Sequence, residues 1–189
     1  MDKLRIFLSL NIDSSLTGKI SEIQDEIKSE LKEHSIKWEN PEKFHLTLRF
    51  LDSVYEETIF QMINALNNLR FDFEKIIFQT NGINFFPNKR KPNVVFINLK
   101  EFGDNTAKLT KAIDEVLSGF GFQKDKDFVP HITIGRFKRE KRTPLDYSRF
   151  RDFDKFNVEF NSFFLMKSVL DYKGSKHYPV KEFKFKQNT

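Results

Sequence analysis

The chain has 189 residues, a mass of 22.5 kDa, 31% charged residues, a formal net charge of +5 and a pI near 9.2. This length suffices for one sizeable core. No apolar run is long enough to cross a bilayer, and the absence of cysteine excludes disulfides, thiolate zinc sites and cysteine nucleophiles. The N-terminus meets an acidic residue too early for a signal peptide, so we expect a cytoplasmic protein without membrane contact. The positive net charge favours an anionic partner.

The first half of the chain reads as strand, helix and strand. Residues 4–12 alternate apolar and polar side chains, which predicts a strand. Asp13 offers an N-cap for a helix whose apolar stripe runs to Leu31. HLTLRFL, residues 45–51, predicts a second strand, and the capping-box pattern from Ser53 to Glu56 predicts that another helix begins there.

The first half ends with residues 73–86, which look extended. The second half then repeats the order of the first, since residues 93–99 predict a strand and a helical stripe follows that Gly119 ends. HITIGRF, residues 131–137, is then the second strand of this half. The tail predicts a short helix near 145–150, an extended run over 153–170, a turn at Gly174 and a last strand over 180–185. We therefore expect one domain over 1–189, built from duplicated halves of roughly 1–90 and 91–189.

The two halves share a short motif of histidine, apolar residue, threonine and apolar residue. It occurs at His45 and Thr47 and again at His131 and Thr133. Side chains at i and i+2 of a strand share a face, about 6.6 Å apart at their Cα atoms. One such motif is an ordinary half-exposed strand. Two copies at equivalent places in duplicated halves indicate two imidazoles and two hydroxyls that converge on a central cleft.

Two opposed imidazoles suit a reaction at a phosphodiester. In an in-line displacement the attacking and leaving oxygens lie on opposite sides of phosphorus, so the base and the acid must be opposed too. Imidazole can be neutral at one position and protonated at the other near neutral pH, and threonine hydroxyls can bind the non-bridging oxygens. The motif lacks His-x-His, HExxH and a flanking carboxylate pair, so we expect no metal.

Two arginines extend the motifs. Arg49 continues the polar face of its strand and could bind a phosphate, although a salt bridge is nearly as plausible. Strict alternation puts Arg136 opposite His131, so it reaches the cleft only if Gly135 allows a bulge or the strand ends there. His177 stands in a turn-like segment, GSKHYP, and we expect it at the surface rather than as a third catalytic group.

FHLTLRFL and PHITIGRF resemble the paired motifs of the two-histidine (2H) phosphoesterase superfamily, and more closely its RNA 2',3'-cyclic phosphodiesterase branch, long called 2'-5' RNA ligases. The resemblance covers nearly the whole chain. It implies a bilobal α+β fold in which two pseudo-symmetric lobes line a central cleft with antiparallel sheets and carry their helices outside. It also implies action without metal. We expect no cofactor, and we expect a monomer, since the sequence offers no coiled coil or exposed seam.

The resemblance assigns roles to the motif residues. It implies that His45 and His131 are the acid-base pair and that Thr47 and Thr133 bind phosphate oxygens. The sequence alone does not order the pair, and we take His45 as the proton donor and His131 as the proton acceptor. The family reaction opens a terminal 2',3'-cyclic phosphate on RNA and leaves a 2'-phosphate. We expect RNA ends or small cyclic nucleotides as substrates, with Arg49 or Arg136 as further phosphate ligands.

Two positions depart from the family pattern. Family members often have glycine where this chain has Asp52, and alanine where it has Gly135. Neither position carries a reacting group, so both concern local geometry and substrate fit.

Three alternatives remain open at this point. The same groups could serve a 2'-5' RNA ligase, with a 5'-hydroxyl in place of water, or a phosphodiesterase for 2'-5' oligonucleotides. A module that binds RNA ends without turnover is the third. Intact His and Thr in both motifs argue against it, since a pure binder would more plausibly use Arg or Lys there.

Overall fold

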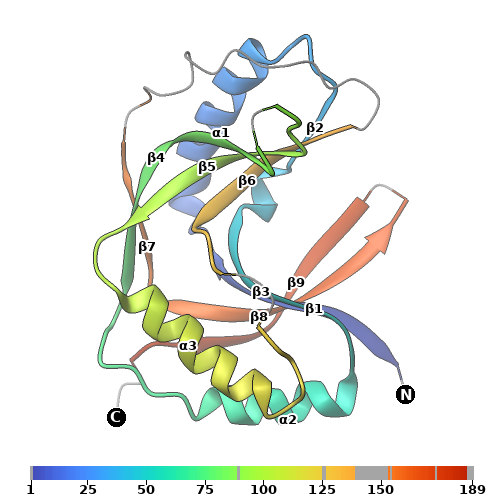
Figure 1. Cartoon of the computed structure of the whole chain (residues 1–189), viewed down its shortest axis with the longest axis vertical. Helices are drawn as coiled ribbons and strands as arrows, with labels where there is room; N and C mark the ends of the chain where they lie inside the picture. The colour runs from blue at the N-terminus through green and yellow to red at the C-terminus, as the bar shows by residue number, and fades with distance from the viewer. Residues whose placement is uncertain are drawn as a thin grey trace.

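A computed structural model describes residues 2–88, 90–124, 127–138, 153, 155–172 and 174–186. Its strands form two antiparallel sheets (Figure 1). Sheet 1 has the order β3 (His45–Tyr55), β1 (Lys3–Asn11), β8 (Ser162–Asp171) and β9 (Gly174–Lys184). Sheet 2 has the order β2 (Ile36–Trp38), β6 (His131–Phe137), β5 (Val94–Glu101), β4 (Ile76–Phe86) and β7 (Asn157–Phe160). The predicted α+β class is confirmed.

Each sheet draws strands from both halves of the sequence. β8 and β9, from the end of the chain, pair beside β1, while β2 and β4, from the first half, lie in sheet 2. The repeated order of strand, helix and His-x-Thr strand is still visible as β1, α1 and β3 and as β5, α3 and β6. The two structural layers therefore differ from a simple division of the chain near residue 90.

Among the described residues, three α-helices cover the sheets: α1 (Ser14–Glu30), α2 (Glu56–Asn67) and α3 (Asn105–Ser118). In Figure 1, α1 lies beside sheet 2, and α2 and α3 lie together beside sheet 1. Asp13 caps α1 as predicted, since its carboxylate accepts a hydrogen bond from the Ser15 amide at 2.8 Å. No helix in the described part of the chain is long and apolar enough to span a membrane.

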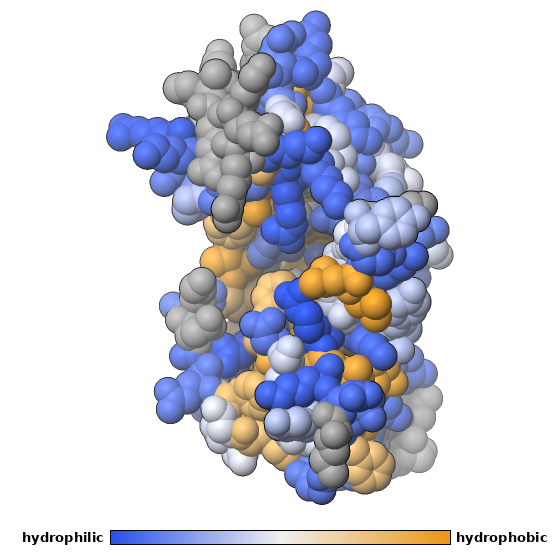
Figure 2. Space-filling model, turned by 90° about the vertical axis from the view of Figure 1, so that its right-hand side faces the viewer, coloured by the Kyte–Doolittle hydropathy of each residue, from blue (hydrophilic) through white to orange (hydrophobic). Residues whose placement is uncertain are grey.

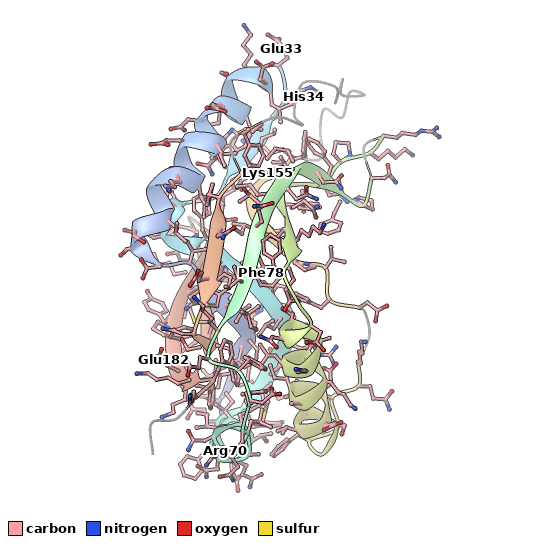
Figure 3. The ribbon with its side chains drawn as sticks, turned by 90° about the vertical axis from the view of Figure 1, so that its left-hand side faces the viewer. Glu33, His34, Arg70, Phe78, Lys155 and Glu182 are labelled. Atoms are coloured by element: carbon pink, nitrogen blue, oxygen red, sulfur yellow. The ribbon has the colours of Figure 1, made fainter. Side chains whose placement is uncertain are left out.

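The core is rich in phenylalanine, as the composition requires. Phe78 lies near the middle of the molecule in Figure 3 and is fully buried. The largest fully buried side chains include Phe7, Phe78, Phe96, Phe163 and Phe185. Burial of one such ring contributes about 1.5–3 kcal/mol, so these rings are a large part of what holds the sheets together. Figure 2 also shows hydrophobic side chains at the surface in the middle and lower part of the molecule.

Some predicted boundaries were wrong. The capping box at Ser53 does not start a helix, because β3 continues to pair with β1 as far as Tyr55 and α2 begins at Glu56 without a side-chain cap. The run 153–170 is two strands rather than one, since β7 and β8 join different sheets on either side of Asn161. The last strand, β9, begins at Gly174, earlier than predicted. The predicted helix near 145–150 lies outside the described residues.

Candidate active site

His45 stands at the first position of β3, directly after the short 3₁₀ helix Pro41–Lys43. Its Nδ1 lies 2.6 Å from the Lys43 carbonyl oxygen and its Nε2 lies 3.0 Å from Thr47 Oγ1. A carbonyl only accepts, so Nδ1 carries the proton in the neutral ring and Nε2 accepts from the threonine hydroxyl. The sequence motif therefore fixes both the tautomer and the direction of the imidazole.

His131 begins β6 in the same way. Its Nδ1 donates to the Val129 carbonyl oxygen at 2.7 Å, again two residues earlier in the chain. Each histidine also pairs across its sheet with an asparagine, His45 with Asn11 of β1 and His131 with Asn98 of β5. The two motifs are thus equivalent in local geometry, and in both the Nε2 atom is the one left for chemistry.

The two motifs lie near each other, since β3 and β6 are in contact and the charge of His131 acts on His45. Burial lowers the pKa of His45 to about 4, and the charges of His177, His131 and Arg136 lower it further, against the Lys43 carbonyl, which raises it. Burial likewise lowers the pKa of His131, with a smaller contribution from Arg136. Both imidazoles are therefore mainly neutral at pH 7 in the free protein.

A β-bulge in β3 turns Arg49 away from this face. Thr47 pairs with Ser9 but Arg49 pairs with Leu8, so Leu48 is an extra residue. Leu8 is fully buried, and Arg49 shares its face. The Arg49 guanidinium lies 3.3 Å from Asp114 of α3 and donates to the Gln123 carbonyl oxygen at 2.5 Å. The structure therefore gives Arg49 the ion-pair role and does not bring it to the two imidazoles.

The equivalent bulge in β6 has the opposite effect on Arg136. Thr133 pairs with Phe96 but Gly135 pairs with Val95, so Ile134 is the extra residue. After this bulge Arg136 pairs with Val94 and lies on the same face as Thr133. Its charge lowers the pKa of both His45 and His131. The condition that the sequence left open at Gly135 is met, and Arg136 joins the site.

Gly135 is required by its neighbours rather than by its backbone angle. A Cβ atom there would lie 2.8 Å from Ile36 Cγ2, 2.9 Å from Trp38 Cε3 and 3.0 Å from Val95 Cγ1. These are closer than real Cβ contacts. The absence of a side chain therefore lets β2 and β5 approach β6 at the bulge.

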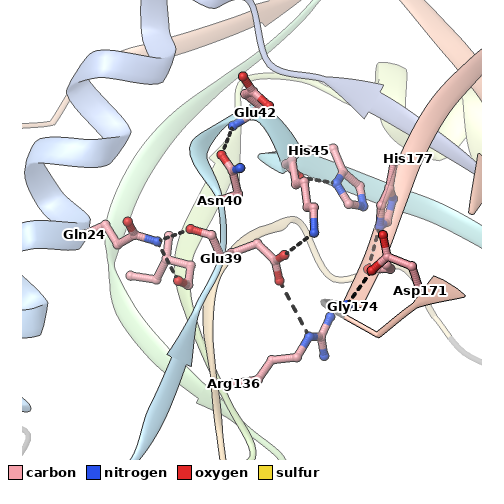
Figure 4. Close-up of polar contacts among 12 residues, drawn as sticks. Gln24, Glu39, Asn40, Glu42, His45, Arg136, Asp171, Gly174 and His177 are labelled. Atoms are coloured by element: carbon pink, nitrogen blue, oxygen red, sulfur yellow. Dashed lines mark hydrogen bonds and ion pairs between the residues drawn. The ribbon is translucent and has the colours of Figure 1, made fainter. Parts of the chain in front are cut away.

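Glu39 and Gln24 hold the bulge and the arginine in place (Figure 4). The buried Gln24 amide of α1 donates to the Ile134 and Glu39 carbonyl oxygens, at 2.8 Å each, and the Glu39 amide donates to the Ile134 carbonyl oxygen at 3.0 Å. The Glu39 carboxylate then lies 3.9 Å from Arg136 Nε and 3.8 Å from Lys43 Nζ. Sequence analysis did not single out either residue.

Aromatic rings enclose both imidazoles, which the sequence did not predict. Phe7 lies 5.2 Å from the His45 ring, and Phe96 and Phe86 lie 5.1 Å and 5.0 Å from the His131 ring, between centroids. Phe7 and Phe96 lie in the first strand of each repeat, β1 and β5. The duplicated order of strands is therefore the sequence signal that could have identified them. These rings supply the burial that lowers both pKa values.

Beside His45 there is a third imidazole, that of His177, whose ring centroid lies 5.4 Å away. This half-buried position differs from the surface position that we expected. Among the described residues, no three His, Cys, Asp or Glu side chains are grouped as a metal site. Metal independence stays a prediction.

A family model described as LigT like Phosphoesterase matches residues 10–96 and again residues 97–177. The chain belongs to this family. Relatives of this LigT-like phosphoesterase include the RNA 2',3'-cyclic phosphodiesterases of Archaeoglobus fulgidus and Methanocaldococcus jannaschii. The A. fulgidus protein is 35% identical to this chain over 90% of this chain and 94% of its own length. The M. jannaschii protein is 30% identical over 95% of this chain and 99% of its own length. The resemblance stated from the two motifs is confirmed.

Solved structures show the same fold at low identity. The protein TT0787 of Thermus thermophilus has a TM-score of 0.77 at 21% identity and covers 96% of this chain, with 98% of its own length covered. E. coli LigT in its apo form has a TM-score of 0.77 at 17% identity over 99% of this chain and 100% of its own. The bilobal fold of the LigT-like phosphoesterases is therefore also that of this chain.

Asp52 is the departure from the family pattern with a visible cause. Its φ is +55°, in the left-handed region that glycine adopts freely and aspartate tolerates better than most residues. Its carboxylate lies 3.6 Å from the Arg5 guanidinium, although both side chains are exposed. Asp52 pairs with Ile6 within β3, next to a shift in the register with β1, so this strand keeps a left-handed backbone position there with a residue other than glycine.

Proposed function

We propose that this protein is a metal-independent RNA 2',3'-cyclic phosphodiesterase that opens terminal cyclic phosphates to 2'-phosphates. The observation that carries the proposal is the pair of equivalent imidazoles, each held through Nδ1 by a main-chain carbonyl so that Nε2 is left for proton transfer. A hydroxyl two residues along each strand accompanies each of them. The names of the relatives support the same reaction, since those proteins are called RNA 2',3'-cyclic phosphodiesterases.

In the proposed mechanism, His131 Nε2 takes a proton from water as its oxygen attacks phosphorus. His131 is less enclosed than His45, which suits the residue that must meet water. The bond from phosphorus to the 3' oxygen breaks, and His45 Nε2 gives its proton to that oxygen. Thr47, Thr133 and Arg136 stabilise the charge on the non-bridging oxygens.

The bound phosphodiester also favours the protonated form of His45, which a proton donor needs. The low pKa of His45 leaves its ring neutral in the free protein at pH 7. A phosphate anion within hydrogen-bonding distance favours the charged imidazolium and raises that pKa. His45 thus becomes an effective proton donor chiefly when the substrate is present.

A nucleotide substrate also fits the surroundings of the site. The Phe50 side chain is 70% exposed and its ring lies 5.8 Å from that of Phe7, which contacts His45. An exposed aromatic face beside a phosphate site can stack on a base. E. coli LigT, which shares the fold, has been crystallised in complexes with 3'-AMP, NADP+ and ATP. The cytoplasmic location and the monomeric state stay predictions from the sequence.

The decisive test is hydrolysis of a short RNA that ends in a 2',3'-cyclic phosphate, with EDTA present. We expect a 2'-phosphate product from the wild type and almost none from His45→Ala or His131→Ala. His34→Ala is the matched control, because His34 lies near one end of the molecule, just past α1 (Figure 3). Thr47→Ala and Thr133→Ala should lose less, at most a few kcal/mol of transition-state stabilisation each.

The same assay separates the alternatives. A longer strand formed with an added 5'-hydroxyl RNA would indicate a ligase, and cleavage of 2'-5' oligonucleotides alone would indicate the other phosphodiesterase. Binding without turnover would indicate a module for RNA ends. Loss of turnover with EDTA that added metal restores would refute the metal-independent mechanism.

A further inference from the structure

His177 brings a third imidazole to the site from the edge strand of sheet 1. It stands on β9 and pairs with Ser168 of β8. Figure 4 shows its ring next to that of His45, although the two residues are far apart in the sequence. The proposed mechanism uses two imidazoles, so the third requires a separate explanation.

The rings of Phe7, His45 and His177 form a closed triangle. Their centroids are 5.2 Å apart for Phe7 and His45, 4.9 Å for Phe7 and His177, and 5.4 Å for His45 and His177. Phe7 is buried in the core, with 2% of its surface exposed, and so acts as a fixed wall. His177 packs edge-on against that wall and also contacts His45. Removal of the His177 ring would open a space beside the His45 imidazole.

The nitrogens of His177 are not presented for proton transfer. Nε2 lies 3.1 Å from Ser175 Oγ, two residues earlier on the same strand. Nδ1 is buried and has no hydrogen-bond partner among the described residues. A substrate could reach Nδ1 only after rotation of the ring, and it could reach Nε2 only after the hydrogen bond to Ser175 breaks. The ring is therefore placed to contact its neighbours rather than the reacting atoms.

Charged groups surround this ring. Burial lowers the pKa of His177, the charges of Lys43 and Arg136 lower it too, and Glu39 raises it. The ring is consequently held mainly neutral near pH 7, and it can pack against His45 without strong charge repulsion. Ser175 and the pairing of β9 with β8 keep it in that orientation.

We propose that His177 is a positioning residue, which packs the His45 imidazole against Phe7 so that His45 Nε2 stays directed at the phosphate. This inference rests on the proposed function, because it concerns the proton donor of that reaction. His45 is otherwise fixed by two hydrogen bonds, from Nδ1 to Lys43 and from Thr47 to Nε2. The second of these must break when Nε2 donates its proton to the substrate. Ring packing then becomes a larger share of what holds the imidazole.

The test compares His177→Ala with His177→Phe, which keeps a ring but removes both nitrogens. For His177→Ala we expect a kcat lower by roughly 10- to 100-fold, as for a displaced catalytic group, and a KM within about twofold of wild type. His177→Phe should recover most of the lost kcat. Tyr178→Ala is the matched control on β9, because adjacent strand residues point to opposite faces and Tyr178 is 49% exposed.

Other results would overturn the inference. A higher KM with unchanged kcat in His177→Ala, or a His177→Phe as slow as His177→Ala, would show that the nitrogens act on the substrate. Wild-type kcat in both variants would show that the ring positions nothing. If the alanine variant does not fold, His177→Val, a smaller truncation that also removes the ring, takes its place beside His177→Phe, and the same outcomes decide.

A second readout does not depend on turnover. The ¹⁵N chemical shifts of His45 report its tautomer and hydrogen bonds, and we expect them to change in His177→Ala and to stay near wild type in His177→Phe. If the wild type fails to hydrolyse cyclic phosphates, the proposed function is refuted while this measurement still tests the packing. Unchanged His45 shifts in His177→Ala would refute the positioning role itself.

Discussion

Acid should destabilise this protein through His45 well before its carboxylates are protonated. The pKa of His45 is about 4 in the folded chain, because burial disfavours the charged ring, against 6.5 for an ordinary histidine. Between these values the unfolded chain binds a proton that the folded chain does not. Stability therefore falls as the pH falls through this window, which is the sign expected for a histidine whose pKa is lowered on folding.

The size of the effect follows from the two pKa values. From pH 7 to pH 4.5, this single proton lowers the free energy of unfolding by about 2 kcal/mol. His131 and His177 add to the loss in the same direction, since burial lowers the pKa of both. Such a change is a sizeable part of the total stability of an average domain.

Urea unfolding at pH 7, 5.5 and 4.5 measures this loss, with His45→Gln as the comparison. The variant should lose about 2 kcal/mol less than wild type over this range, whatever its stability at pH 7. His34→Gln serves as the control histidine and should follow the wild type. Equal losses in wild type and His45→Gln would refute the argument that His45 is held neutral by burial.

Three further predictions concern the site and its supports. The kcat/KM for a cyclic nucleotide should be bell-shaped in pH with its maximum below 6.5, because both imidazole pKa values are lowered, and a maximum above pH 7.5 would contradict this. Gly135→Ala should cost about 1–3 kcal/mol in urea unfolding through overpacking, whereas Gly18→Ala, with no atom within 4 Å of its new Cβ, should cost nothing. Asp114→Ala should lower the free energy of unfolding by about 2–3 kcal/mol, because the largely buried Arg49 then lacks the carboxylate of Asp114. Asp25 is exposed, so Asp25→Ala should change the free energy of unfolding by less than about 0.5 kcal/mol. Equal effects of these two aspartates would refute the buried role of Arg49.

The fold and the reacting groups were predictable because they depend on periodicity. Alternation of apolar residues identified β1, β3, β5 and β6, and the repeated His-x-Thr spacing identified four candidate site residues on shared faces. These signals are local, and each is repeated in both halves. Duplication also made the family resemblance specific.

The side of the sheet on which each arginine lies was not predictable, because a bulge reverses the alternation without a strong sequence signal. Leu48 and Ile134 are ordinary strand residues, yet each is the extra residue of the bulge that follows its motif. Gly135 indicated a possible bulge in β6, but no residue indicated the bulge in β3. His177 was missed for a different reason, since its contact with His45 depends on the pairing of β9 beside β8 and β1.

The two equivalent bulges also place different side chains at matching positions of the duplicated site. Five residues after the histidine, the second motif has Arg136 and the first has the exposed Phe50. We therefore expect Arg136→Met to lower kcat/KM by a similar factor for all cyclic nucleotides, since in the proposed mechanism Arg136 binds the phosphate that all of them share. Phe50→Ala should instead raise KM, by about tenfold for purine ends and less for pyrimidine ends, because loss of one stacked base costs roughly 1–3 kcal/mol and purines stack more area. Steady-state kinetics on the four nucleoside 2',3'-cyclic phosphates measure both. A lower kcat without a change in KM in Phe50→Ala would mean that this ring supports the catalytic groups rather than the base.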